Sequence, residues 1–232
     1  MLSFWRKQIF GFVAIGCALF VLLTAGAMLF YPGGTASDPA TSGYSFFTNF
    51  FSDLGRTQAR NGQMNTIAAP LFFLALSLAG ASLIAFSLAF APFFTRTWLD
   101  RALAWLGALA GIVAGACFIG IAFTPANLDS ARHTQFVYAA FEAFTAAAIL
   151  YSVVLERERR FPKRFAVVFG VFAVLLLFYL GLLFGGPSTK TPQGVLIQAT
   201  GQKIIVYASI VSVLIQALAA RSIIHSSVER SK

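Results

Sequence analysis

Six long apolar segments, separated by polar connections, constrain this chain more than any other feature. A helix needs about 20 residues to cross a hydrocarbon core of ~30 Å. An unpaired backbone group in lipid costs several kcal/mol, so segments of this kind are predicted to be α-helices. They cover roughly residues 8–30, 66–92, 102–124, 134–154, 165–185 and 201–221. The sequence therefore predicts an all-α polytopic membrane protein, a six-transmembrane-helix bundle that forms a single domain over residues 1–232.

The composition of the chain agrees with this class. Hydrophobic residues make up 58% of the sequence, above the usual apolar share of a soluble domain, and the mean hydropathy is +0.79. The first apolar segment follows Arg6 and Lys7 as the core of a signal peptide would. It is too long for one, however, and lacks a small-x-small cleavage site before Tyr31. We expect it to be retained as the first helix.

The distribution of positive charge predicts the orientation. If the N-terminus is cytoplasmic, twelve of the 17 Lys and Arg residues lie on the cytoplasmic side, the bias that the positive-inside rule favours. We therefore expect a multi-pass protein of the plasma membrane with both termini in the cytoplasm (N-in/C-in). Orientation and anionic lipid headgroups also explain the net charge of +9, much of which lies in the loop 155–164. Nucleic-acid binding is not expected, because no basic nucleic-acid-binding fold carries this charge.

The connection between the first two apolar segments is long, running from Tyr31 to Asn65. Its second half has an aromatic face and a polar face at helical spacing. The aromatic face holds Phe46, Phe47, Phe50, Phe51 and Leu54, and the polar face holds Asn49, Ser52, Asp53 and Arg56. This pattern predicts an amphipathic interfacial segment in the first outer loop. In a purely structural alternative, Asp53 pairs with Arg56 or caps a neighbouring helix.

His133 is expected at the start of the fourth helix, on the same side of the membrane as Asp53. A histidine near an acid is typical of a general base, so Asp53 and His133 are the candidate catalytic pair. A hydrogen bond from His133 to a loop carbonyl is the structural alternative. The other histidine, His225, is expected on the opposite side, which argues against a multi-histidine zinc site. Cys17 and Cys117 lie within apolar segments and are expected to be buried thiols.

Glu142 lies about nine residues into the fourth apolar segment, where a carboxyl group is costly and marks a functional hypothesis. Two polar stripes at helical spacing accompany it: Gln135, Tyr138, Glu142 and Thr145 in the fourth segment, and Gln202, Ser209 and Gln216 in the sixth. If the stripes face each other, they form either a hydrogen-bonded bundle core or a narrow polar path. His133 points the opposite way from Glu142 if it is already helical, because nine helical steps add up to about half a turn.

Glycines recur every four residues in the third segment, at Gly107, Gly111 and Gly115. Small residues at this spacing let another helix backbone approach closely. A contact within the bundle is favoured over a dimer interface, and the third helix is expected at the centre of the bundle.

Several short motifs occur in an order typical of one family. They are Tyr31-Pro32, Ser52-Asp53-Leu54-Gly55, Asn65, Phe123-Thr124-Pro125, His133 and Gln202-Lys203. In this respect the chain resembles the six-helix membrane family catalogued as domain of unknown function 998. The resemblance implies that Ser52, Asp53, Gly55, Asn65, Pro125, His133 and Gln202 are family-type positions. Lys203 stands where an arginine is expected and Thr124 where a glycine or phenylalanine is expected. The family carries no settled activity, so the resemblance implies positions rather than a function.

Three functional hypotheses remain. The first is a non-enzymatic lipid-binding or accessory module, with membrane lipids as partners and a membrane-protein partner or a second copy of the chain as further candidate partners. The second is a membrane-embedded enzyme acting on a lipid or polyprenyl-linked substrate. Its headgroup would be bound by Ser52, Arg56, Asn65, Arg132, Gln202 and Lys203. The third is a small-solute or proton transporter that uses the intramembrane polar residues Glu142, Tyr138 and Gln216. No nucleotide loop, haem motif or metal-ligand spacing is present in the sequence, so no cofactor or metal is expected.

Overall fold

The apolar segments form six long α-helices in the computed structural model, which describes residues 2–229. The helices are α1 Leu2–Leu29, α2 Ala68–Phe90, α3 Trp98–Phe123, α4 Ser130–Arg157, α5 Lys163–Gly185 and α6 Pro192–Glu229. Two short 3-10 helices, η1 Phe51–Gly55 and η2 Ala91–Phe93, lie in the connections. All six α-helices are long and apolar enough to cross a membrane, and no strand element occurs in residues 2–229. The predicted all-α class and the six membrane helices are confirmed.

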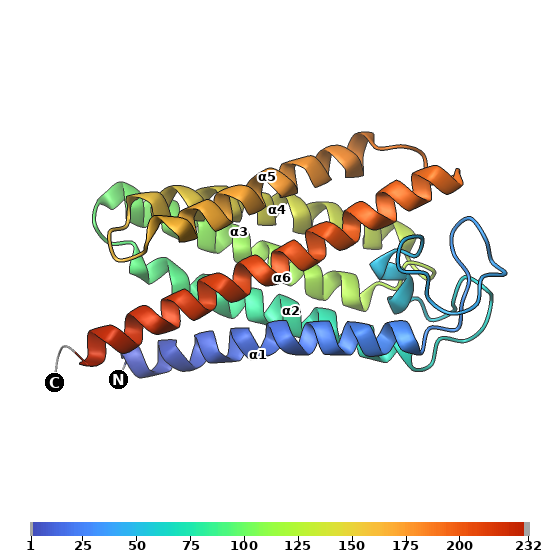
Figure 1. The fold of residues 1–232 in the computed structure, drawn as a ribbon, viewed down its shortest axis with the longest axis horizontal. Coiled ribbons are helices and arrows are strands. Elements are labelled where there is room, and N and C mark those ends of the chain that lie inside the picture. The colour runs from blue at the N-terminus through green and yellow to red at the C-terminus, as the bar shows by residue number, and fades with distance from the viewer. Residues whose placement is uncertain (1, 230–232) are drawn as a thin grey trace.

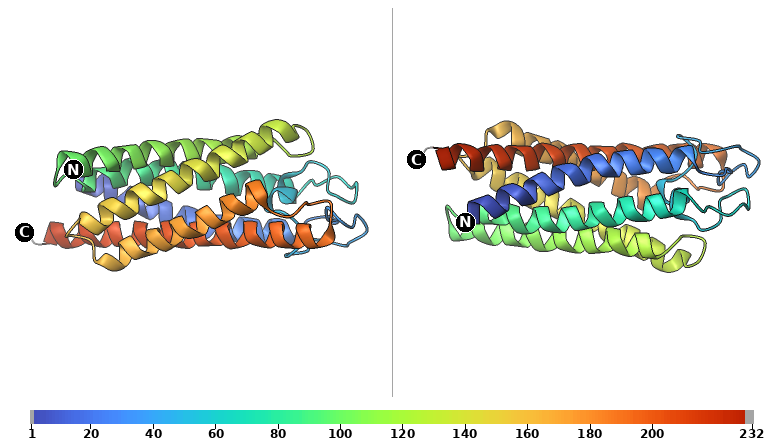
Figure 2. Two further views of the ribbon diagram at one scale, coloured as in Figure 1. Left: turned by 90° about the horizontal axis from the view of Figure 1, so that it is seen from above. Right: turned by 90° about the horizontal axis from the view of Figure 1, so that it is seen from below.

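The helices form a closed ring in the order of the sequence. Each helix packs against the next one, and α6 closes the ring by packing against α1. In Figure 2 the view from below shows α6 and α1 side by side. Both termini lie at one end of the bundle, called the terminal end here, and the long loop between α1 and α2 lies at the other, the loop end (Figure 1).

The position predicted for α3 is wrong. Its main neighbours are α2 and α4, and it forms one wall of the ring instead of its centre. Its glycines explain the difference, because they serve both neighbours. A Cβ on Gly115 would lie 2.6 Å from the Gly80 carbonyl oxygen of α2, and a Cβ on Gly107 would touch Tyr151 of α4. The prediction that the glycine stripe packs within the bundle is confirmed.

The terminal end of the bundle is filled by aromatic rings and braced by charged residues. Phe90 lies at the centre of the cluster and packs edge-on against Phe94 and Phe161. Arg160 pairs with Glu158, at 2.9 Å. Burial alone would raise the pKa of the Glu158 carboxyl, but its hydrogen bonds to Arg160 outweigh this effect and lower the pKa. This end of the molecule is therefore tightly packed, whereas the middle of the ring is not.

Candidate functional site

Asp53 holds the long loop together from the middle of η1. Its side chain is 1% exposed, and both carboxylate oxygens accept hydrogen bonds from the loop itself. Oδ1 accepts from Arg60 Nε at 2.8 Å. Oδ2 accepts from Asn49 Nδ2 at 3.1 Å and from the Phe50 amide at 2.9 Å. The partner of Asp53 is therefore Arg60, whereas Arg56 donates to the Gln58 carbonyl.

The helical part of this loop is shorter than the sequence pattern suggests. Only Phe51–Gly55 are helical, as a 3-10 helix, so the aromatic residues do not share one face. Phe51 and Leu54 are buried against the bundle, while Phe46 and Phe47 are exposed. On the polar face, Asn49 and Asp53 are buried, which leaves Ser52 as the polar residue of η1 that faces a pocket.

Lys203 fastens the loop to α6. Its side chain is 1% exposed and its amine donates to the Asn49 carbonyl. The Tyr44, Phe46 and Phe51 rings surround the amine with centroids 5.3, 5.4 and 5.7 Å away, an aromatic cage in which cation–π attraction partly replaces lost hydration. Lys203 is thus occupied within the protein and is not part of either pocket.

Two tyrosines complete the hydrogen bonding of the loop. The Tyr44 hydroxyl donates to the Phe50 carbonyl at 3.1 Å, and the Tyr31 hydroxyl accepts from the Arg60 amide at 3.1 Å. Burial raises the pKa of both phenols, and the nearby Asp53 charge raises it further. Both tyrosines therefore stay neutral. The hydrogen-bonded loop, residues 30–67, covers the loop end of the bundle, and we call it the cover.

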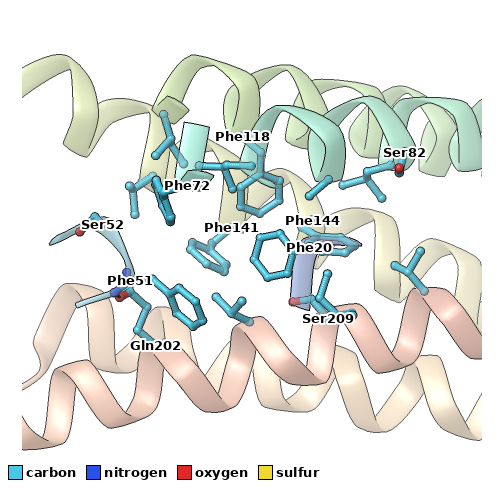
Figure 3. Close-up of a pocket in the computed structure, with 18 of the residues that line it drawn as sticks. Phe20, Phe51, Ser52, Phe72, Ser82, Phe118, Phe141, Phe144, Gln202 and Ser209 are labelled. Atoms are coloured by element: carbon cyan, nitrogen blue, oxygen red, sulfur yellow. Dashed lines mark hydrogen bonds between the residues drawn. The ribbon is translucent and has the colours of Figure 1, made fainter. Parts of the chain in front are cut away.

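A central pocket lies inside the ring beneath this cover. Its cavity volume is about 90 Å³, and the space free of protein atoms is about 870 Å³ when the gaps between the lining side chains and the open mouth are included. Aromatic rings from five elements line it: Phe20, Phe51, Phe72, Phe118, Phe141 and Phe144. Figure 3 shows these rings gathered between the helices, with Ser52 and Gln202 at one end and Ser82 and Ser209 further along. No charged residue lines the pocket, so it suits an apolar chain.

A second pocket, the loop-side pocket, adjoins the first. It lies between the loop and the loop-side ends of α2 and α3, and its space, open solvent included, is about 800 Å³. Four residues line both pockets: Ser52, Phe72, Ile121 and His133. We call these four the junction. Asn65 and Pro125 also line the loop-side pocket.

His133 reaches the junction from the first turn of α4. Its Nδ1 lies 2.7 Å from the Thr124 carbonyl oxygen. A carbonyl can only accept, so Nδ1 carries the hydrogen, and Nε2 of the neutral ring is left as an acceptor. The ring is thereby held in one tautomer and one orientation. The structural alternative, a hydrogen bond to a loop carbonyl, is the one formed, but it leaves the other nitrogen available.

Gln202 links α6 to the cover. Its Oε1 accepts from the Phe51 amide at 2.7 Å, which orients the first turn of η1 over the central pocket. Asn65 does the same from the start of α2, because its Nδ2 donates to the Leu54 and Arg56 carbonyls at 2.8 and 2.9 Å. Its Oδ1 is buried and has no partner in the part of the chain that the structure describes.

The expected facing polar stripes do not form. Glu142 and Gln135 are exposed on the outer surface of α4, and Tyr138 packs against Phe184, with centroids 4.9 Å apart. On α6, Gln216 donates to the Phe165 carbonyl of α5 at 2.7 Å. The inward face of α4 is occupied by His133 and the aromatic residues of the pocket, so Gln135 and Glu142 point outward. Thr145 is buried and donates to the Phe141 carbonyl of its own helix. Consistent with the predicted half-turn, His133 and Glu142 point to opposite sides.

Arg132 also lies apart from the site. Its side chain is 74% exposed and pairs with Asp129 at 3.3 Å. The structure thus brings together Ser52, Asn65, His133 and Gln202 from the positions singled out in the sequence. It leaves Asp53 and Lys203 in the packing of the cover.

Sequence reasoning missed the aromatic lining and the role of Arg60. The lining phenylalanines come from segments far apart in the chain, and each looks like an ordinary lipid-facing or core residue of its own helix. For Arg60, a signal was present, since it is a second arginine in the same loop as Asp53. Spacing favoured Arg56 because a helix was expected there, and the loop turns back instead.

Comparison with known proteins identifies a family but no activity. No curated protein and no solved structure matches the chain. A family model described as "Protein of unknown function (DUF998)" matches residues 24–219. This stretch contains the long loop, the loop-side pocket, α2 to α5 and most of α6, but only the end of α1. The chain therefore belongs to this family of multi-pass membrane proteins of unknown function.

Proposed function

We propose that this protein binds one amphiphilic lipid in the membrane, with the hydrocarbon tail in the central pocket and the head at the junction. The observation that carries this proposal is the central pocket, an uncharged chamber lined by aromatic rings whose polar end is formed by Ser52, His133 and Gln202. Ligand sites are typically concave and mostly apolar, with a few polar groups that orient the ligand. A non-enzymatic lipid-binding module fits this arrangement best.

The geometry of the two acids supports this choice over the alternatives. Asp53 uses both oxygens within the cover, which does not favour it as a general acid or base. Glu142 lies on the outer surface of the ring, away from the central pocket, which does not favour a polar transport path through it.

A pocket-filling substitution tests the proposal. Val137 is a residue of α4 that lines the central pocket, and Val137→Phe places a ring in the space that the proposed lipid tail occupies. Val153→Phe is the matched control, because Val153 is on the same helix but 43% exposed at the outer surface. We expect native mass spectrometry to show one retained lipid on the wild type and on Val153→Phe, and much less on Val137→Phe. An unchanged lipid adduct on a folded Val137→Phe protein contradicts the proposal.

A second function, chemistry on the bound lipid, is favoured by one observation. Ser52 and His133 both line the junction, and neither Ser52 Oγ nor His133 Nε2 has a hydrogen-bond partner within residues 2–229. A hydroxyl and a free imidazole nitrogen are the groups of nucleophilic or acid–base catalysis. Incubation of the wild-type protein with an esterified lipid, followed by mass spectrometry, tests this function. Products that disappear in both Ser52→Ala and His133→Phe support it, and an intact lipid after long incubation contradicts it.

We also propose a plasma-membrane location with both termini in the cytoplasm. In support, the terminal end carries most of the lysines and arginines, including the loop 155–164. A fluorescent-protein fusion at the C-terminus should be fluorescent, and an alkaline phosphatase fusion at the same point should be inactive. The reverse pair of results would place the loop end and the junction on the cytoplasmic side.

A further inference from the structure

The groups left free around the junction restrict the head of the ligand. His133 Nε2 is an acceptor, because Nδ1 donates to the Thr124 carbonyl. Asn65 Oδ1 is also an acceptor, because Nδ2 is the amide atom that donates to the two loop carbonyls. Asn65 is 2% exposed, and its Oδ1 has no partner in the described part of the chain. A buried polar atom without a partner costs free energy, and a donor on the ligand recovers it where the ligand reaches this atom from the loop-side pocket, which Asn65 lines.

The remaining polar groups can donate as well as accept. Ser52 carries a hydroxyl that rotates to suit its partner. The Gln202 amide nitrogen lies beside the Tyr179 hydroxyl, and the oxygen of the same amide is taken by the Phe51 amide. A head that both donates and accepts therefore matches the junction. An ionised carboxylate or phosphate only accepts, and it would face the lone pair of His133 Nε2.

The charges around the two pockets independently indicate that the head of the ligand is uncharged. Neither pocket is lined by a lysine, an arginine, an aspartate or a glutamate. The nearest cation along the loop, Arg56, lines neither pocket and donates to the Gln58 carbonyl. Arg60 is paired with Asp53, and Lys203 lies in its aromatic cage. Moving a charged head from the interface into such an uncharged, partly dry site is costly without a counter-ion.

The tail contributes little to selectivity. A hydrocarbon chain that moves from lipid into an apolar pocket gains no hydrophobic free energy, since the bilayer is equally apolar. Selection among membrane lipids must therefore come from the head and its hydrogen bonds.

We infer that the ligand is an uncharged lipid whose head is a hydroxyl group, as in a long-chain or prenyl alcohol or an acylglycerol, and that this hydroxyl donates to His133 Nε2. The inference rests on the proposed lipid-binding function and specifies its ligand class. His133 is a binding residue that accepts the hydrogen of the ligand hydroxyl. Ser52 or Gln202 donates a hydrogen bond to the oxygen of the same hydroxyl.

A set of ligands with one tail and different heads tests the inference. The full chain is reconstituted in phosphatidylcholine nanodiscs, and binding of tritiated 1-oleoylglycerol is measured by scintillation proximity. The competitors are oleyl alcohol, oleic acid, oleyl phosphate and methyl oleate, with geranylgeraniol added to separate prenyl from acyl sources. We expect the alcohols to compete at least tenfold better than the acid, the phosphate and the methyl ester.

The variants separate the two levels of the proposal. His133→Phe keeps a ring of similar size but removes the acceptor, so it should reduce the preference for oleyl alcohol over methyl oleate about tenfold. Arg132→Ala is the control, because Arg132 is the exposed neighbour of His133 and lines neither pocket. If oleyl phosphate or oleic acid competes as well as the alcohol on the wild type, the hydroxyl inference is overturned while lipid binding stands. If no ligand binds the wild type, the proposed function itself fails, and this ranking does not depend on any variant folding.

Discussion

Both oxygens of the Asp53 carboxylate accept hydrogen bonds from the loop, so this residue acts by fixing the shape of the loop. Its oxygens gather the Phe50 amide, the Asn49 side chain and Arg60 around one turn. This turn of the loop positions Ser52 at the junction. A motif residue can thus matter for binding without touching a ligand.

The substitution Asp53→Asn should destabilise the protein by about 3 kcal/mol. It leaves Arg60 without its anion and turns an amide nitrogen towards donors, and breaking a buried ion pair costs about 3–5 kcal/mol. The lower value is expected because the Arg60 side chain is 30% exposed. Unfolding in detergent, followed by circular dichroism, measures the change.

Asp129→Asn is the matched control for this substitution. Asp129 also accepts an amide hydrogen and pairs with an arginine, but it is exposed and caps α4, a role that asparagine fills equally well. Its cost should stay below about 0.5 kcal/mol. Equal losses for the two variants would contradict the structural role given to Asp53.

At the residue scale, the sequence predicted which residues are candidates for the site better than it predicted the contacts that those residues make. The half-turn between His133 and Glu142 follows from helix geometry alone and is observed. The partner of Asp53 was not predictable, because it depends on how residues 56–60 turn back towards η1. The free acceptor of His133 depends on the Thr124 carbonyl, which only becomes available where α3 ends.

At the scale of elements, α1 and α2 approach so closely that one side chain fills the space of another. A Cβ on Gly16 would lie 2.2 Å from Ser82 Oγ. Ser82 Oγ itself is buried and has no hydrogen-bond partner in residues 2–229, unlike Ser87 and Ser209, which donate to carbonyls four residues earlier. The Ser82 hydroxyl is therefore a packing group.

Gly16→Ala should cost about 1–3 kcal/mol, the range for overpacking. Ser82→Ala alone should cost much less, because it breaks no hydrogen bond and removes only the oxygen. In the double variant the new methyl group no longer meets that oxygen, so part of the Gly16→Ala cost should be recovered. A double-mutant cycle from chemical unfolding gives this coupling energy, and strict additivity would show that the two helices are not in this contact.

The two faces of α4 make a separate prediction. The inward face carries His133 and Val137, whereas Glu142 is exposed on the opposite face. Glu142→Gln removes a charge from the outer surface and leaves the central pocket unchanged. We expect the variant to retain its lipid as the wild type does in native mass spectrometry. A clear loss of the lipid would show that the outer face of α4 takes part in binding.

Considered as a whole, the molecule is a ring of helices with a covered opening. Hydrophobic patterning predicted the number and nature of the helices, since each span can be recognised on its own. It did not predict the ring, because the glycines of α3 indicate close packing but not the neighbour to which they belong. The central pocket could not be predicted from the sequence for the same reason, because the residues that line it are spread along the chain from Gly16 to Val213.

The length of the pocket sets a prediction for the tail. Residues 202 to 213 of α6 line it, a distance of about 16 Å at 1.5 Å per residue. In nanodiscs, affinity expressed as mole fraction should vary little among alcohols whose tails fit this length, because lipid and pocket are equally apolar. A steady rise with every added methylene would instead indicate non-specific partitioning.

The closure of the ring by α6 against α1 has a consequence for biosynthesis. The helix that completes the wall is also the one that anchors the cover, through Gln202 and Lys203. Until that helix is inserted, the space between α1 and α5 is open sideways to the bilayer, and the cover lacks its attachment. Under the proposed function, we therefore expect the first lipid to enter the space during synthesis, from the membrane in which the chain is made.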